Sequence, residues 1–424
     1  MFLIYDLIYF LAAIVYLPVF LIRRKLHPGF ARRLGFLPKG LKLDRPIWIH
    51  AVSVGEVMAV RGLLEELKKA YPRKDFVIST VTPTGNSVAR NISARGDFIT
   101  YLPLDFSFTV GAVLKRVKPS LFILAETELW PNLIGYLKKE GIPIIVVNAR
   151  LSERSFKKYL CANFLLKNAL NKINLFCVQA PRDAEKLRRL GVYEYKIRVT
   201  GNMKFDMKDY SDLKDKCPAL KRKLGLKGKL LVAGSTHPGE EEAILRAYKR
   251  LLADFPDLEL LIAARHPERT QEVEKLVLSS GFKTRRISRL SGPLEEGASG
   301  KTVFILDTVG QLLSFYALAD IVFVGGSLAK KGGHNILEPA ALGKPVLFGP
   351  QMFNFRDIAD LFLENNAGIL VEDEEELVPK IKALLRDPSG AEALSQNAGR
   401  LIDDNRGATA KNMLLIKEYA RIPV

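Results

Sequence analysis

Two stretches of the chain repeat the same alternation of short, apolar, β-rich runs and amphipathic helical segments. In the first stretch the candidate strands are residues 47–52, 76–81, 121–125, 143–148 and 175–179. In the second stretch they are residues 230–233, 258–263, 302–306, 321–324, 345–348 and 368–371. Strands that alternate with helices are typical of βαβ units. The pattern therefore predicts an α/β protein with two doubly wound, Rossmann-like domains, each built on a parallel sheet.

The segment between the two alternations is charged and has no strong apolar period, so we expect residues 206–228 to form a linker. A length of 424 residues also favours two domains over one. We predict a first domain at 26–205 and a second domain at 229–424, whose last helix is a candidate to pack back on the first domain. Two such domains that face each other would share a cleft at the carboxyl ends of their strands, where open α/β sheets bind ligands.

The first 22 residues, Met1 to Ile22, are almost wholly apolar, and the basic residues Arg23, Arg24 and Lys25 follow them. This run is about long enough to cross a bilayer. A secretory signal peptide would need a basic start and a small-residue cleavage site, and neither is found. We therefore expect residues 1–25 to be a membrane-anchor helix, and the positive-inside rule then keeps the remainder cytoplasmic. A helix that lies in the membrane interface is the alternative.

Charge and composition narrow the function classes. An apolar fraction of 48% and a charged fraction of 26% exclude a disordered chain and a protein with many membrane spans. The net charge of +18 favours anionic partners, which include nucleic acid, phospholipid headgroups and phosphorylated substrates. The three cysteines lack CxxC spacing, which indicates a reducing compartment, the cytosol. Without a GxGxxG fingerprint or a P-loop, hydride transfer and nucleotide hydrolysis lose support.

Two acidic motifs follow strands of the first domain. Ser53-Val54-Gly55-Glu56 is either a capping box or a site where the Glu56 carboxylate takes a proton from an attacking hydroxyl. Glu126 and Glu128 directly follow another apolar strand. They could chelate a divalent cation, or stand at the start of the next helix and favour its dipole. The five histidines show no metal-ligand spacing and no clear Asp-x-Asp motif occurs, so we expect no bound metal.

Lys204, near the end of the first domain, could neutralise a developing negative charge, or it is a solvated surface side chain. In the second domain, residues 234–242 follow a strand and open a helix, so Ser235 and Thr236 either help to bind a phosphate or carboxylate or cap that helix. Arg265 and His266 either place two potential cations at the same sheet edge or are ordinary exposed side chains. Residues 325–339 combine glycines, two lysines and a helix start, an arrangement that suits a phosphate held by backbone amides.

Taken together, these motifs resemble the 3-deoxy-D-manno-octulosonic acid (Kdo) transferases of lipid A core assembly. The resemblance covers nearly the whole chain, from the N-terminal anchor to Pro339, and it rests on the motifs at 50–56, 126–131, 201–205, 234–237 and 332–339. It implies a GT-B architecture, a CMP-Kdo donor, a tetraacylated and bisphosphorylated lipid A precursor as acceptor, and no metal or other cofactor. In this family Glu56 would be the proton acceptor, while Glu126 and Lys204 would support the transition state.

The resemblance also implies nucleotide contacts. The CMP-binding positions carried over are Ala264, Arg265, Val309, Gly310, Gln311, Asn335, Ile336, Leu337 and Glu338. Further donor contacts are expected at Ser235, Thr236, His266 and Gly333. Two positions depart from the family pattern, since Ala264 stands where proline is usual and Gln311 where glutamate is expected. A neutral amide at Gln311 can still form a hydrogen bond with a base or ribose.

The function expected from the resemblance is inverting transfer of Kdo from CMP-Kdo to the lipid A precursor, lipid IVA, in lipopolysaccharide biosynthesis. The partners would be CMP-Kdo, the lipid A precursor and the cytoplasmic face of a bacterial inner membrane, without nucleic acid. One alternative in the same fold is a UDP-sugar-dependent transferase that acts on another lipid acceptor. An alternative from another class is a non-enzymatic basic protein that binds membranes or nucleic acid.

Overall fold

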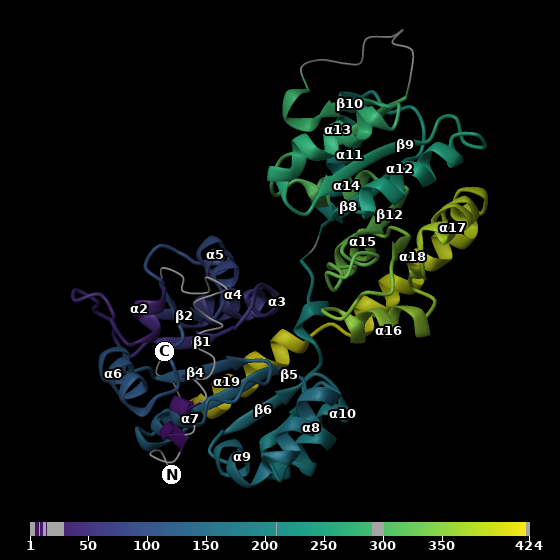
Figure 1. Ribbon diagram of the computed structural model, residues 1–424. Helices are drawn as coiled ribbons and strands as arrows, with labels where there is room; N and C mark the ends of the chain where they lie inside the picture. The colour runs from purple at the N-terminus through teal and green to yellow at the C-terminus, as the bar shows by residue number, and fades with distance from the viewer. Residues whose placement is uncertain are drawn as a thin grey trace. The chain divides into compact units, whose positions relative to one another are not determined.

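The computed structural model describes residues 5–7, 9–11, 14, 29–208, 210–290 and 301–420. The chain forms two compact units (Figure 1). Unit 1 comprises Met1–Asp206 and Asn405–Val424, and unit 2 comprises Met207–Asp404. Each unit is built on its own parallel α/β sheet, as the repeated alternation predicts.

The sheet of unit 1 has the order β3-β2-β1-β4-β5-β6-β7, and every pairing is parallel. Its central strands are buried on both faces, which explains why they are continuous apolar runs without polar alternation. The strands are β1 (Ile47–His50), β2 (Phe76–Thr80), β3 (Phe98–Tyr101), β4 (Leu121–Ala125), β5 (Ile144–Ala149), β6 (Leu175–Val178) and β7 (Ile197–Val199).

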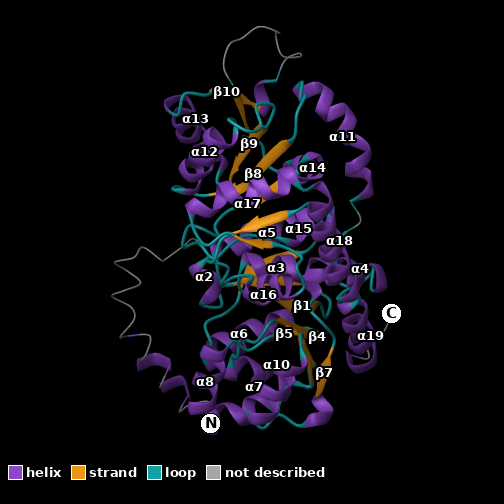
Figure 2. Cartoon of the chain, turned by 90° about the vertical axis from the view of Figure 1, so that its right-hand side faces the viewer, coloured by secondary structure: helices purple, strands orange, loops and turns teal. Residues whose placement is uncertain are grey.

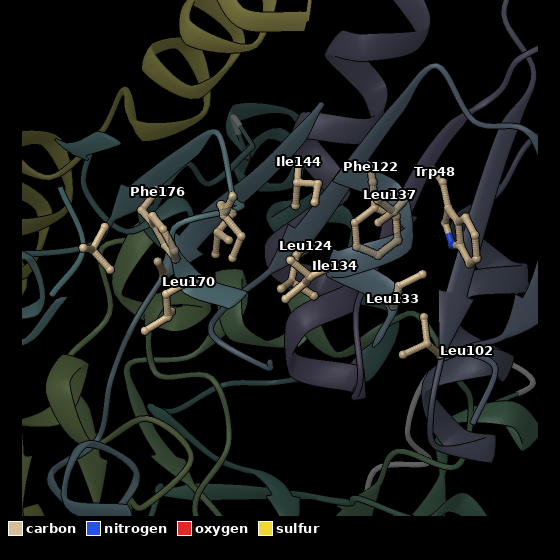
Figure 3. Close-up of a cluster of buried hydrophobic side chains, with 14 of the residues drawn as sticks. Trp48, Leu102, Phe122, Leu124, Leu133, Ile134, Leu137, Ile144, Leu170 and Phe176 are labelled. Carbon is tan, nitrogen blue, oxygen red and sulfur yellow. The ribbon is translucent and has the colours of Figure 1, made fainter. Parts of the chain in front are cut away.

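Helices cover both faces of this sheet, so unit 1 has two cores. One core joins Trp48 and Phe122 to the helices α6 and α7, and Figure 3 shows Trp48, Phe122, Leu124 and Leu137 within it. The other core contains Ile49 and includes Leu63 of α4. The helical elements of the unit are α2 (Phe30–Arg33), α3 (Val54–Ala59), α4 (Arg61–Ala70), α5 (Pro83–Ile92), α6 (Ser107–Val117), α7 (Pro131–Lys139), α8 (Glu153–Cys161), α9 (Asn163–Leu170), α10 (Pro181–Arg189), the 3-10 turns η1 (Glu194–Lys196) and η2 (Met203–Phe205), and α19 (Ala408–Ala420).

The last helix, α19, is part of unit 1 although unit 2 precedes it in the sequence. Its Met413 and Ile416 are buried in the second core of the unit, and the helix packs against α4. The carboxylate of Asp206 accepts hydrogen bonds from the backbone amides of Gly407, at 2.6 Å, and Thr409. These bonds attach the start of α19 and the turn before it to the end of the first domain.

Unit 2 has the sheet order β10-β11-β9-β8-β12-β13-β14, again with parallel pairings. Figure 2 shows α12 and α13 on one side of these strands and α11 and α14 on the other. The strands are β8 (Leu230–Thr236), β9 (Glu259–Ala264), β10 (Lys283–Arg286), β11 (Thr302–Ile305), β12 (Ile321–Val324), β13 (Val346–Phe348) and β14 (Ile369–Leu370). The helical elements are α11 (Ser211–Leu224), α12 (Glu240–Leu251), α13 (Thr270–Ser279), α14 (Leu312–Leu318), α15 (Leu337–Ala341), α16 (Arg356–Glu364), α17 (Glu374–Arg386), α18 (Pro388–Asp404), η3 (Pro267–Arg269) and η4 (Ile287–Arg289).

The segment 206–228, expected to be a linker, instead contains helix α11, which packs against α14. The helix has one narrow apolar stripe, formed by Leu213, Cys217, Leu220 and Leu224, and most of the positions between them are charged. Leu224 is fully buried. A stripe of this width lowers the average hydropathy of the segment, and for that reason the sequence pattern does not stand out.

The expected membrane anchor, residues 1–25, lies almost entirely outside the described residues and stays a prediction. Within the described ranges, no helix has both the length and the apolar character needed to span a bilayer. The carboxylate of Asp6, one of the described residues, accepts hydrogen bonds from the Ser107 amide at 3.0 Å and from Asn132 Nδ2 at 2.6 Å. These bonds connect the N-terminal segment to the starts of α6 and α7.

Candidate functional site

Glu56 lies in the first turn of α3, just after the carboxyl end of β1. Its side chain is buried, with 8% of its surface exposed. Glu56 Oε2 accepts a hydrogen bond from the Val52 amide at 2.7 Å, and Oε1 accepts one from the Ser53 hydroxyl at 3.0 Å. The expected capping box is not formed, because the Ser53 hydroxyl makes no bond to a helix amide and Glu56 accepts from the amide of Val52 instead of that of Ser53.

Burial and like charge make Glu56 a weaker acid than an ordinary glutamate. Desolvation, followed by the negative charge of Glu126, raises the pKa of Glu56 to about 8. The hydrogen bonds from Val52 and Ser53 oppose this rise. A carboxyl group with a pKa close to neutral can both take up and release a proton near neutral pH, as general acid–base catalysis requires.

Glu126 and Lys204, which are 78 positions apart in the sequence, form an ion pair. Lys204 Nζ lies 3.5 Å from Glu126 Oε1, and both side chains are mostly buried. Glu126 follows β4 directly with a φ of 56°, in the left-handed region. Lys204 lies in η2, where its amide donates to Asn202 Oδ1 at 3.0 Å. Glu56 and Glu126 thus follow the neighbouring strands β1 and β4, and Lys204 reaches Glu126 from η2, so the structure brings the three predicted catalytic side chains together in unit 1.

The two alternative interpretations of Glu126 and Glu128 can also be compared with the structure. Both glutamates precede α7, which begins at Pro131, so they are not in the first turn of that helix. Within the part of the chain that the structure describes, no group of three or more His, Cys, Asp or Glu side chains could hold a metal ion. Burial and the charge of Glu126 raise the pKa of Glu128, while Arg33 lowers it.

His50 is a residue of this edge that the sequence reasoning did not assign to the site. It is completely buried, and its Nδ1 lies 3.0 Å from the Ser79 carbonyl oxygen and 2.9 Å from the Ser79 hydroxyl. Because a carbonyl only accepts, Nδ1 carries the proton and Nε2 has the free lone pair. Burial lowers the pKa of His50 to about 3, so the ring is neutral at physiological pH. The sequence signal that could have identified His50 is its position shortly before the Ser53–Glu56 motif, at the end of the same strand.

In unit 2 the expected donor contacts follow neighbouring strands. Ala264, Arg265 and His266 follow β9, and the exposed segment 309–311 follows β11. Residues Ser235 and Thr236 end β8, while residues 325–333, called the glycine loop below, follow β12. Because β11, β9, β8 and β12 are adjacent and parallel, all four loops leave the same edge of the sheet.

Ser235 and Thr236 are engaged within the protein. The hydroxyl of Thr236 donates to Glu241 Oε1 at 2.9 Å, and Thr236 is fully buried. Ser235 forms a hydrogen bond with the buried hydroxyl of Tyr316. Neither side chain caps α12, whose N-cap is Gly239, so the helix-capping interpretation is wrong.

The glycine loop does not offer its first amides to a phosphate, which is a correction to the sequence-based expectation. The buried carboxylate of Glu240 accepts hydrogen bonds from the amides of Gly326, Ser327, Leu328 and Ala329 at 2.7 to 3.1 Å. It also accepts one from the His237 amide at 2.9 Å. An internal carboxylate thus occupies the anion position that these amides create.

The segment 335–338 is mostly internal. The side chains of Ile336 and Leu337 are fully buried, so only their backbone could contact a ligand. Asn335 Oδ1 accepts a hydrogen bond from the Leu337 amide at 3.1 Å and so helps to begin α15. Burial raises the pKa of Glu338, while the bond from Asn335 and the charge of Arg265 lower it.

Two parallel α/β units, each with polar residues at the carboxyl ends of its strands, form the architecture of the GT-B fold class. Residues 242–400 match the family model described as glycosyl transferases group 1. The fold is similar to that of a UDP-N-acetylglucosamine 2-epimerase, with a TM-score of 0.57, 17% identity and coverage of 91% of this chain and 98% of the other. It is also similar to a glycosyltransferase from Rickettsia africae, with a TM-score of 0.53, 15% identity and coverage of 90% and 100%.

The sequence comparisons identify the family. Residues 28–207 match the family model described as 3-deoxy-D-manno-octulosonic-acid transferase (kdotransferase). The chain is 36% identical over 374 residues to the 3-deoxy-D-manno-octulosonic acid transferase of Haemophilus influenzae, which covers 88% of this chain and 87% of the relative. The chain belongs to the family of 3-deoxy-D-manno-octulosonic acid transferases.

Proposed function

We propose that this protein is an inverting glycosyltransferase that moves Kdo from CMP-Kdo to the tetraacylated, bisphosphorylated lipid A precursor. The observation that carries the proposal is Glu56, a buried carboxyl at the end of β1 whose pKa is raised to about 8. A group of this kind can remove a proton from an attacking hydroxyl near neutral pH. Family membership supports Kdo as the transferred sugar.

In the proposed reaction, Glu56 takes the proton of a glucosamine 6-hydroxyl of the acceptor. The hydroxyl oxygen then forms a bond to the anomeric carbon of Kdo from the face opposite the phosphate. The bond from that carbon to the phosphate oxygen breaks, and CMP leaves with the electron pair. Attack from the opposite face inverts the anomeric configuration.

Lys204 and Glu126 act as a unit in this proposal. The ammonium of Lys204 stabilises negative charge that develops in the transition state, and Glu126, 3.5 Å away, holds it in place. A lysine with a fixed position stabilises charge better than a mobile surface lysine, because less reorganisation is needed during the reaction.

The leaving nucleotide is an anion, and Arg265 supplies a cation at the edge of the unit 2 sheet. The exposed segment 309–311 and the backbone of 335–338 are the proposed contacts of the cytidine and ribose. We further propose that the protein works at the cytoplasmic face of a bacterial inner membrane, held by residues 1–25. The net charge of +18 supports attraction to anionic lipid headgroups and to a phosphorylated acceptor.

Mass spectrometry of lipid A precursor after incubation with the protein and freshly generated CMP-Kdo tests the proposal. We expect a mass increase by one or more Kdo residues with the unchanged protein, and a rate reduced by about 10²–10⁴-fold with Glu56→Gln or Glu56→Ala. Glu66→Gln on α4, an exposed glutamate paired with Lys69, is the matched control and should leave the rate unchanged. Near-normal turnover by both Glu56 variants would disprove the base assignment.

Nucleotide selectivity separates this proposal from the UDP-sugar alternative. CMP should raise the thermal unfolding temperature of the protein more than UDP at equal concentration, because the ligand that binds the folded state more tightly stabilises it more. A larger effect of UDP would favour the alternative.

A further inference from the structure

Three histidines lie together at the edge of the unit 2 sheet where the expected nucleotide contacts follow the strands. His237 Nε2 lies 2.9 Å from His334 Nε2, and the two rings are stacked with a centroid distance of 5.2 Å and an interplanar angle of 10°. The ring of His266 meets that of His237 edge-on at 5.7 Å. Two ring nitrogens at this distance must share one proton, because two lone pairs or two protons facing each other repel.

The glycine loop places His334 in this pair. Gly332 and Gly333 have φ values of 96° and 71°, and a side chain at Gly333 would lie 2.1 Å from Met352 Sδ. A Cβ atom at Gly326 would lie 2.9 Å from His334 Nε2 and 3.4 Å from His237 Cδ2. The glycines that the sequence pattern assigns to phosphate binding therefore serve to seat the His334 ring beside His237.

The surroundings of the histidine pair are basic. Burial lowers the pKa of His237 and lowers that of His334 to about 3. Neighbouring cations hold both pKa values down further, and the Glu241 carboxylate opposes this for His237. The groups that face the pair are Arg265, His266, Arg269, Lys331 and Glu241. The pair is consequently neutral at physiological pH, and an incoming anion would reverse the electrostatic balance.

We propose that the His237–His334 pair binds an oxyanion of the donor and takes up a proton from solvent when it does so. The oxyanion is the nucleotide phosphate or the carboxylate of the acidic sugar, both of which accept hydrogen bonds from an imidazolium. The inference rests on the proposed function in one respect, namely that the donor is a nucleotide-activated acidic sugar. Arg265 lies close enough to both His334 and Glu338 to influence their charge, which places the pair beside the expected nucleotide contacts.

Proton uptake distinguishes this role from a structural one. An oxyanion next to the pair favours its charged form and raises the pKa of the pair by about 1–3. By linkage, donor affinity must then fall as the pH rises through the pKa of the bound state. A pair that only stabilises the loop would change the unfolding temperature without exchanging a proton on ligand binding.

Calorimetric titration of the full-length protein at pH 6.0, in buffers of different ionisation enthalpy, measures this uptake. The methyl ester of CMP is a suitable probe, because it is a phosphodiester like the donor and its phosphate does not titrate near neutral pH. We expect the protein to take up a few tenths of a proton per ester bound, and its affinity to fall by roughly three- to tenfold between pH 5.5 and 7.5. Cytidine, which lacks the phosphate, should cause no uptake.

Variants of the two histidines test whether the proton is taken up by the pair. His237→Gln and His334→Gln keep a polar group near the Nε2 position but do not titrate, so both should abolish the uptake and weaken ester binding about tenfold at pH 6.0. Gly326→Ala keeps both histidines but displaces the His334 ring, and it should have the same effect. Lys249→Gln, an exposed lysine in the last turn of α12, removes one positive charge elsewhere and should change neither quantity.

Each outcome has a defined meaning. Uptake with free Kdo but not with the CMP ester would assign the pair to the sugar carboxylate. Binding of both probes without proton exchange, or unchanged uptake in both glutamine variants, would overturn the inference. Parallel assays of Kdo transfer separate the two proposals. Normal transfer with no histidine-dependent uptake refutes only the inference, while histidine-dependent uptake without any transfer refutes only the proposed function.

Discussion

Replacing Glu56 with glutamine removes a charge from a buried position while keeping almost the same shape. The difference between the ordinary glutamate pKa of 4.5 and the value of about 8 in the folded protein corresponds to roughly 5 kcal/mol. Local relaxation and entry of water reduce such penalties in real proteins. We therefore expect Glu56→Gln to stabilise unit 1 by about 1–3 kcal/mol at pH 8.5 relative to the unchanged protein.

The sign of this effect follows from the direction of the pKa change. Because the folded state holds the Glu56 proton more tightly than the unfolded state, ionisation costs stability as the pH rises from 4.5 to about 8. Below pH 4.5 both states are protonated and the penalty disappears. The stabilisation by glutamine should thus be smallest in acid and should grow steadily up to about pH 8.

Tryptophan fluorescence measures unit 1 alone, since the chain has two tryptophans, Trp48 and Trp130, and both lie in that unit. Urea unfolding of the two proteins would be followed at pH 5.5, 7.0 and 8.5. Glu66→Gln is again the control, because it makes the same chemical change at an exposed position. A stability difference between Glu56→Gln and the unchanged protein that is constant with pH would refute the reasoning.

Three further predictions concern the two sheet edges. Lys204→Met should lower kcat/KM for Kdo transfer by about 10–100-fold. The double variant Lys204→Met/Glu126→Gln should lose less kcat/KM than the product of the two single losses, because the two groups act as one ion pair. A loss equal to that product would contradict this coupling. Glu240→Ala should destabilise unit 2 by about 3–5 kcal/mol, measured by calorimetry, because it leaves five amides, three of them buried, without their acceptor. Gly234→Ala should lower the free energy of unfolding of unit 2 by about 1–3 kcal/mol, because its Cβ would lie 2.1 Å from the Tyr316 hydroxyl oxygen. The control Gly399→Ala, with open space around it, should be neutral or slightly stabilising.

Much of the fold could be predicted because strand identity is a local property. The run Leu121–Ala125 was expected as a strand from its apolar residues alone, and β4 has the same bounds. A strand that is buried on both faces must be apolar at every position, so the sequence records its burial directly. Helix α11 was missed because its apolar stripe is narrow and charged residues surround it.

The chemistry of the two edges was predicted less completely. The sequence indicated Glu56 as a carboxylate at a strand end, but its raised pKa depends on burial and on Glu126, 70 positions away. The glycine loop had the composition of a phosphate site. Its amides are nevertheless taken by Glu240, more than 80 residues earlier in the chain.

The sequence by itself determined the two α/β domains and the positions of the motifs at their strand ends, because apolar periodicity and turn residues act over a few neighbouring positions. Only the tertiary structure decided which polar groups meet. It pairs Lys204 with Glu126 and His237 with His334, and these pairs set the charge at each edge. Hydrogen bonds and pKa values depend on distances between groups that are far apart in the chain, and those distances exist only after the strands are ordered in the sheet.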